Sequence, residues 1–99
     1  PDDLYSAPPL ISACFFGELK DVALLLLAGA NINGRDDGNS TPLHTASGNG
    51  RVDHVRLLLA WGGAKVNAKS VNGITPLQFA IDNGHVEVER LLREAGAVE

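Results

Sequence analysis

The sequence predicts an all-α fold in which short helix-turn-helix units stack into a solenoid. Three observations support this prediction. A short phrase occurs three times, with 33 positions between Pro9 and Pro42 and 34 between Pro42 and Pro76. Each copy begins with residues that start a helix, and each is followed by an aliphatic stretch that ends in glycine. A fixed period of this length is typical of repeat proteins, in which neighbouring units bury one another's apolar faces.

The clearest copy of the phrase predicts a short helix that begins after Thr41. Threonine is a good N-cap because its hydroxyl accepts a backbone N–H of the first turn. Pro42 then takes the first helical position, where a missing N–H costs nothing. Gly50 tolerates the left-handed conformation that ends many helices. The copy that begins at Thr75 has the same pattern, whereas the first copy has Pro8 in place of the capping threonine.

A second, more aliphatic helix follows each phrase. Because residues at i, i+3 and i+4 share one face of a helix, Val55, Leu58 and Leu59 are predicted to point inwards. Val22, Leu25 and Leu26 are expected to do the same in the first copy. The expected helices, in chain order, cover residues 9–16, 19–28, 42–49, 52–61, 76–83 and 86–95.

Turn-forming residues separate the repeats and predict two hairpins, near 36–40 and 70–74. Asn39 and Gly73 take the position that requires a positive φ. Gly63 is interpreted as a one-residue insertion, because the first repeat has a single glycine before its Ala-Asn-Ile-Asn segment. This insertion accounts for the change of period from 33 to 34.

The combined pattern resembles the ankyrin repeat. Thr-Pro-Leu-His at 41–44 is followed by an alanine, a glycine, a leucine pair and Gly-Ala-Lys-Val-Asn at 63–67. The resemblance runs from about Asp3 to Ala97 and divides the chain into repeats at about 3–35, 36–69 and 70–99. It implies an ankyrin-repeat solenoid that recognises other proteins, with structural roles for the histidines at 44 and 85. Asn33 and Asn67 occupy a position that is hydroxylated in some family members, although each could simply bond the loop backbone.

The two ends of the chain differ in composition. Glu89 and Arg93 stand where the earlier repeats have aliphatic residues, which predicts that the third repeat is a C-terminal cap. The chain opens on Pro1, without a signal peptide, so we expect it to be a fragment of a longer protein. We expect an intracellular setting, the cytosol or the nucleus, with an organelle left open because a targeting segment could have been removed.

The first repeat carries bulky apolar residues where its copies are small or polar. Phe15 and Phe16 correspond to Gly-Asn in the second repeat and Asp-Asn in the third. Fully burying one phenylalanine is worth roughly 1.5–3 kcal/mol, so we expect the pair to anchor a functional contact. In the competing interpretation, Leu4 and Tyr5 fold over one of the rings.

Composition excludes several classes of function. The net charge is -4 and there is no lysine- or arginine-rich run, which argues against nucleic-acid binding. No apolar run approaches the ~18 residues of a membrane span. Cys14 is the one cysteine, has apolar neighbours and is expected to be buried and unreactive. No metal-ligand or nucleophile spacing is present, so we expect no catalysis, no cofactor and no metal.

The expected function is binding of another protein or peptide. The predicted binding surface combines the concave face of the first helices with the hairpin tips, where the repeats differ most. Its residues are Ser12, Phe15, Phe16, Thr45, Asn49, Phe79, Asp82, Asn83, Asp37, Asn39, Val71, Asn72 and Ile74. The alternative is self-association, or association with another ankyrin protein, through Ile11, Phe15, Phe16 and Leu27.

Overall fold

A computed structural model of the chain describes residues 7–99. The described residues form six helices and no strand, so the predicted all-α fold is confirmed. The helices are α1 (Ala7–Phe16), α2 (Leu19–Leu27), α3 (Pro42–Gly48), α4 (Val52–Trp61), α5 (Pro76–Asp82) and α6 (Val86–Glu94).

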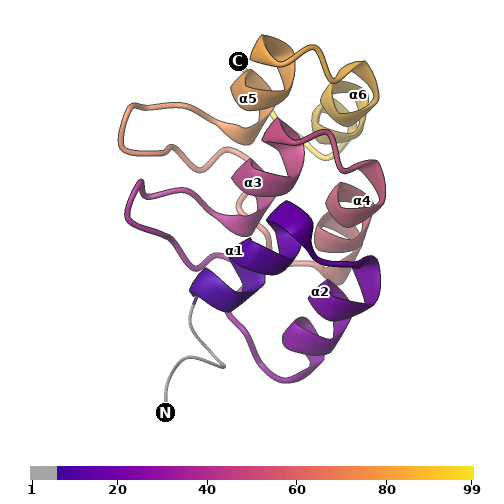
Figure 1. Cartoon of the computed structure of the whole chain (residues 1–99). Helices are drawn as coiled ribbons and strands as arrows, with labels where there is room; N and C mark the ends of the chain where they lie inside the picture. The colour runs from indigo at the N-terminus through magenta and orange to yellow at the C-terminus, as the bar shows by residue number, and fades with distance from the viewer. Residues whose placement is uncertain (1–6) are drawn as a thin grey trace.

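The helices form two layers. The first helices of the repeats pack side by side in the order α1, α3, α5, and the second helices in the order α2, α4, α6 (Figure 1). The loops before α3 and α5 project from the side of the first layer that faces away from the second (Figure 1). This arrangement leaves one face of α1, α3 and α5 beside the hairpins, where a partner can approach.

Local chemistry explains where the first helices begin. The Thr41 hydroxyl accepts the His44 N–H at 3.3 Å, and the Thr75 hydroxyl accepts the Gln78 N–H at 3.1 Å. Both predicted caps are therefore present. Helix α1 begins at Ala7, two residues earlier than predicted, because the first turn of a helix accommodates proline.

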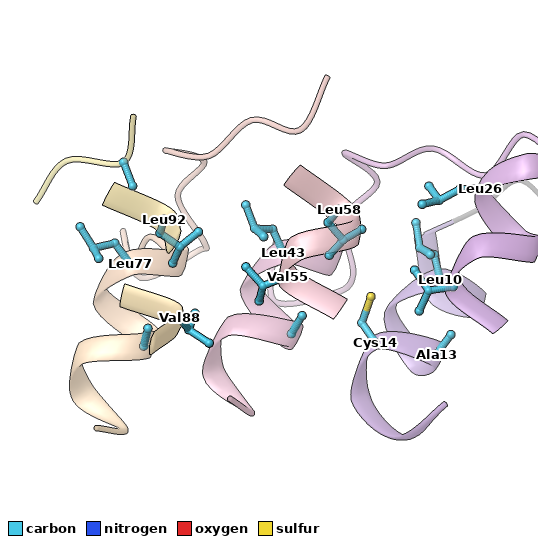
Figure 2. Close-up of a cluster of buried hydrophobic side chains, with 14 of the residues drawn as sticks. Leu10, Ala13, Cys14, Leu26, Leu43, Val55, Leu58, Leu77, Val88 and Leu92 are labelled. Carbon is cyan, nitrogen blue, oxygen red and sulfur yellow. The ribbon is translucent and has the colours of Figure 1, made fainter. Parts of the chain in front are cut away.

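The core runs through all three repeats as one continuous strip (Figure 2). Leu58 and Leu92, which occupy equivalent positions on α4 and α6, are fully buried. One member of each predicted inward stripe, Leu25 in the first repeat and Leu59 in the second, is half-buried and packs against the core. Cys14 is fully buried within this core, as predicted.

Both predicted hairpins are present. The Asp36 N–H donates to the Ser40 carbonyl at 3.0 Å, and the corresponding bond in the second hairpin is 2.9 Å long. Asn39 has a φ of 61°, as its position in the turn required. The Val71 N–H donates to the Gly38 carbonyl at 3.0 Å, so the two hairpins are held side by side.

The inserted glycine is Gly62 and not Gly63. The Asn33 carboxamide donates to the Gly63 carbonyl at 2.7 Å and accepts the Lys65 N–H at 2.8 Å. In the next repeat, Asn67 makes the same pair of bonds to Gly96 and Val98. Gly63 is therefore the equivalent of Gly96, which leaves Gly62, with its φ of 95°, as the extra residue.

Hydrogen bonds between side chains and backbone join consecutive repeats. Nε2 of His44 donates to the Ile74 carbonyl at 2.7 Å, and Nε2 of His85 lies 3.1 Å from the Gly48 carbonyl. The structural roles expected for these two histidines are thus present. The asparagine clamps at Asn33 and Asn67 add further bonds of the same kind, in agreement with the loop-bonding interpretation of both residues.

The outer surface of α6 carries charge where the other second helices are apolar. Arg93 contacts Glu89 at 3.0 Å and Glu99 at 2.5 Å. These three residues form an ion-paired surface at this end of the described chain. That the third repeat closes the array stays a prediction.

Candidate protein-binding groove

A hollow lies along the first helices of the repeats. It has a volume of about 440 Å³ and is called the concave groove here. All three repeats contribute to it, which requires the stacking described above. Its lining residues are Ile11, Ser12, Phe15, Phe16, Asp36, His44, Thr45, Gly48, Asn49, Phe79 and Asn83.

Two phenylalanines form the N-terminal wall of the concave groove. The Phe15 side chain is 53% exposed and the Phe16 side chain 75%. Their ring centroids lie 5.4 Å apart in an edge-to-face arrangement, which is favourable for an aromatic pair. Leu4 and Tyr5, proposed above as a cover for one ring, lie outside the described residues. The wall is therefore an apolar surface that a partner could cover.

The floor of the concave groove is flat because Gly48 has no side chain. A Cβ at this position would meet the Phe79 ring at 3.6 Å, an ordinary contact distance. Phe79 stands beyond the glycine and packs edge-on against His44, with centroids 5.3 Å apart. The small residues of α3 thus leave an open space between the Phe15–Phe16 wall and the ring of Phe79.

Carboxamides and a carboxylate supply the polar atoms of the concave groove. Asn49 donates its side-chain N–H to the Thr45 carbonyl at 2.7 Å, and Asn83 does the same to Phe79 at 2.8 Å. Asp36 accepts the N–H groups of Gly38 and Ser40, at 2.9 and 3.0 Å, through its Oδ1 atom. These internal bonds hold the three side chains at the edge of the groove.

The imidazole of His44 is structural and not a catalytic base. Burial lowers its pKa from the ordinary value of 6.5, against a smaller opposing effect of its bond to Ile74. Its Nδ1 atom accepts the Thr41 N–H at 3.0 Å and its Nε2 atom donates to Ile74, so neither nitrogen is free for substrate. Burial likewise raises the pKa of Cys14 to about 12, which keeps this thiol protonated and unreactive.

The structure brings together seven of the thirteen residues expected to bind a partner. Ser12, Thr45, Phe79, Asn49, Asn83 and the phenylalanine pair all line the concave groove. Asp82 does not line it; this exposed residue accepts a hydrogen bond from Gln78 at 2.7 Å. The sequence pattern does not distinguish Asn83, which lines the groove, from Asp82, which does not, because the two residues are adjacent at the same helix end.

The other expected residues belong to the hairpins. Asp37 lines a second hollow with Arg35, Asp36 and Gly38. Val71 and Asn72 are exposed at the second hairpin, whereas Ile74 is half-buried and its carbonyl is occupied by His44. Asn39 bonds the Lys69 carbonyl at 3.4 Å. Asn39 therefore joins the first hairpin to the segment before the second, and Ile74 joins the second hairpin to α3.

The expected apolar association surface is divided between two layers. Ile11 lines the concave groove beside Phe15 and Phe16. Leu27 is 71% exposed but lies on α2, in the second layer, and does not line the groove. Association through these four residues stays a prediction, and it would involve both helices of the first repeat.

Asp36 is the lining residue that sequence analysis missed. We interpreted it only as a turn former with a solvated charge, and it has that role as well. Its position shortly before the segment 41–44 could have indicated that it lines the groove, because the hairpin leads into α3, which also lines the groove. A turn aspartate therefore also lies at the edge of the candidate binding surface.

Within residues 7–99, no cluster of histidine, cysteine or acidic side chains is arranged to hold a metal ion. None of the helices in this range is both long and apolar enough to cross a membrane.

Comparison with known proteins supports the repeat assignment. A family model described as ankyrin repeats, in three copies, matches residues 10–98. Protein fem-1 homolog C of Danio rerio is 40% identical over 49 residues, which cover 50% of this chain and 8% of that protein. The B-cell lymphoma 3 protein homolog of Mus musculus is 46% identical over 54 residues, covering 54% of this chain and 12% of that protein.

A plant protein gives a longer match. The putative E3 ubiquitin-protein ligase XBAT34 of Arabidopsis thaliana is 44% identical over 63 residues, which cover 61% of this chain and 17% of that protein. The matched segment thus spans less than a fifth of each of these three relatives. The similarity concerns the repeats alone.

Proposed function

The chain belongs to the ankyrin-repeat family, and we propose that it binds a partner protein through the concave groove and the hairpin tips, without catalysing a reaction. Repeats of this family are generally protein–protein interaction modules. The observation that carries the proposal is the exposed pair of phenylalanine rings at one wall of the groove. The proposed setting is intracellular.

Energetics favour a binding role for this pair. Two adjacent exposed aromatic rings are unusual on a soluble surface and mark interaction sites. Aromatic anchors near the centre of an interface commonly dominate binding energy. Phe15 and Phe16 lie beside an open space that a partner side chain could fill, and Asn49 offers a polar contact at its edge.

Self-association is the second candidate, favoured by the exposed leucines of α2. Leu24 and Leu27 are 61% and 71% exposed, so the N-terminal end of the second layer is also apolar. A sister chain or another ankyrin protein could cover them. Light scattering after size-exclusion chromatography separates the candidates, because a monomer at high protein concentration contradicts self-association.

The proposed function is tested by selection from a library of random peptides displayed on phage. We expect peptides that bind the wild-type domain to lose binding to a Phe15→Ser/Phe16→Ser variant. The matched control is Val86→Ser/Val98→Ser, which removes two equally exposed apolar side chains outside the concave groove. Selected peptides that bind both variants equally well would show that the phenylalanine pair is not the anchor.

A further inference from the structure

The polar edge of the concave groove carries carboxamide and carboxylate oxygens. Asn49 and Asn83 each donate one N–H of the side-chain amide to a backbone carbonyl four residues earlier, which leaves the second N–H and the acceptor Oδ1 of each residue available to a partner. Neither Oδ1 has a hydrogen-bond partner among residues 7–99. Asp36 adds a carboxylate, which only accepts when ionised. The hydroxyls of the exposed Ser12 and the half-buried Thr45 can donate as well as accept.

No lysine or arginine lines the concave groove, although the chain has eight such residues. Arg35 is the sequence neighbour of Asp36, but it does not line the groove. Its Nη1 atom donates to the carbonyls of Asn39 and Lys69, each at 2.8 Å. The negative charge of Asp36 therefore lacks a cationic partner in the lining. The net charge of -4 gives the whole molecule the same sign.

The aromatic walls suit a flat cation. The faces of phenylalanine rings attract cations through their quadrupole. A guanidinium group is planar, stacks on aromatic faces and carries five N–H donors, whereas an ammonium is a compact, strongly hydrated charge. Phe15, Phe79, Asn49 and Asn83 all line the concave groove, so aromatic rings and acceptor oxygens lie at one site.

We propose that the concave groove recognises an arginine side chain of a partner protein, with an aliphatic neighbour of that arginine packed on the Phe15–Phe16 wall. The guanidinium donates to the Oδ1 atoms of Asn49 and Asn83 and approaches the carboxylate of Asp36. This inference rests on the proposed protein-binding function and specifies the chemistry of the partner.

A second copy of the chain is a poor source of this arginine. Every arginine of the chain lies within the described residues and is already bonded. Arg56, Arg90 and Arg93 pair with glutamates, and Arg51 donates to the Gly17 carbonyl at 2.5 Å. Arg35 is held by the two hairpin carbonyls. Self-binding would compete with these contacts and bring two molecules of net charge -4 together. The partner is therefore a different protein.

The first experiment titrates the labelled domain with the tripeptide amide acetyl-Leu-Arg-Leu-NH2, followed by NMR of backbone amides. The control peptide has citrulline in place of arginine, which keeps the shape and removes the charge. We expect shifts centred on Thr45, Asn49, Phe79 and Asn83, and binding at least about tenfold weaker for citrulline, the factor that corresponds to losing ~1.4 kcal/mol. Equal binding of both peptides, or shifts elsewhere, would overturn the proposal.

Variants assign the effect to the concave groove. Asp36→Asn removes the charge and keeps an Oδ1 acceptor for the hairpin N–H groups. Asp53→Asn is its matched control, because it removes the same charge from the exposed face of α4. We expect the first variant to weaken arginine binding several-fold and the second to leave it unchanged. Asn49→Lys, which puts a cation into the groove, is expected to abolish it; identical affinities for all three variants would contradict the assignment.

The phage selection separates this inference from the proposed function. If the selected peptides require Phe15 and Phe16 and are enriched in arginine beside an aliphatic residue, both hold. If they require the pair but show no enrichment in arginine, the protein-binding function stands and the arginine inference is wrong. If no peptide depends on the pair, both are wrong.

Discussion

The two ends of the repeat stack treat equivalent helix positions differently. On α2, Leu24 is 61% exposed, although its equivalents Leu57 and Leu91 are half-buried and pack against the core. On α6, the positions that would face a following repeat carry Glu89 and Arg93, which are joined by an ion pair. One end thus keeps an apolar residue where it is exposed, and the other replaces it with charge.

This difference is consistent with the proposed binding of a partner near the N-terminal repeat. Helix α4 packs against α2 of the repeat before it and against α6 of the repeat after it. The ion-paired stripe of α6 is compatible with water, as the outer face of a terminal repeat must be. The N-terminal repeat has a polar residue at Asp21, which caps its own helix, but keeps Leu24, Phe15 and Phe16 exposed. Selection for solubility alone does not account for these three.

The largest loss of stability is expected from a core substitution in the middle repeat, which joins the two ends. Leu58 is fully buried between the layers. Leu58→Ala should lower the free energy of unfolding by roughly 2–5 kcal/mol, because it leaves a cavity in a packed core. Urea unfolding followed by circular dichroism measures this change. A loss below ~1 kcal/mol would show that the middle repeat does not hold the stack together.

Leu25→Ala provides the matched comparison at the N-terminal end. Leu25 occupies the position of Leu58 one repeat earlier, but it is only half-buried. Its loss should therefore cost clearly less than the loss of Leu58. Equal costs would mean that the N-terminal repeat is as well covered as the middle one, which removes the contrast between the ends.

The sequence predicted the fold well because each repeat carries its own local signals. The caps at Thr41 and Thr75 and the turn residues at Asn39 and Gly73 act within a few residues of their position in the chain. The inserted glycine was assigned one residue late, because the hydrogen bonds of Asn33 across 30 and 32 positions decide it. Long-range contacts of this kind leave no local pattern.

The second largest loss of stability should appear at acidic pH, where protonation of His44 weakens the junction of the second and third repeats. Burial lowers the pKa of His44 in the folded chain below its ordinary value of 6.5, so the unfolded chain binds the proton more readily. Stability is therefore complete above pH 6.5 and falls as the pH drops through the folded pKa. Urea unfolding at pH 7.5 and pH 5 measures the loss.

The third repeat provides the control for this prediction. Gln78 takes the place of His44 there and donates its N–H to the same kind of threonine cap. His44→Gln should be less stable at neutral pH, because it loses the bond to Ile74, but its stability should change less between the two pH values. If the pH dependence of stability were unchanged in His44→Gln, another titratable group would be its cause.

The candidate site was less predictable than the fold. Seven expected residues line the concave groove because the first helices align across repeats, which the period already implied. Asp82 was assigned to the binding surface but does not line the groove, and Asp36 lines it but was not assigned to the site. Both differences concern the direction of a side chain in space, which depends on the end of α5 and on the path of the hairpin.

A smaller change in stability is expected at the N-terminal end. Phe15→Ser and Phe16→Ser, singly and together, should lower the free energy of unfolding by no more than about 1 kcal/mol each, because both rings are more than half exposed. Thermal unfolding measures stability, and the peptide binding described above measures association. A loss of several kcal/mol with unchanged association would make the pair part of the core.

The smallest effect on stability should come from making the C-terminal end resemble the N-terminal one. Glu89→Val/Arg93→Leu restores the aliphatic residues that the first two repeats have at these positions. Exposed ion pairs contribute little to stability, so the monomer should unfold almost as before. The variant should instead self-associate at high concentration, because its end surface becomes apolar.

Arg90→Leu/Glu94→Val is the matched control, since it removes another i, i+4 ion pair, and we expect it to associate less. Light scattering compares the two. If both variants stay monomeric, an apolar end surface is not sufficient for self-association. The exposed leucines of α2 would then not support self-association, and the concave groove would remain the candidate binding surface to test.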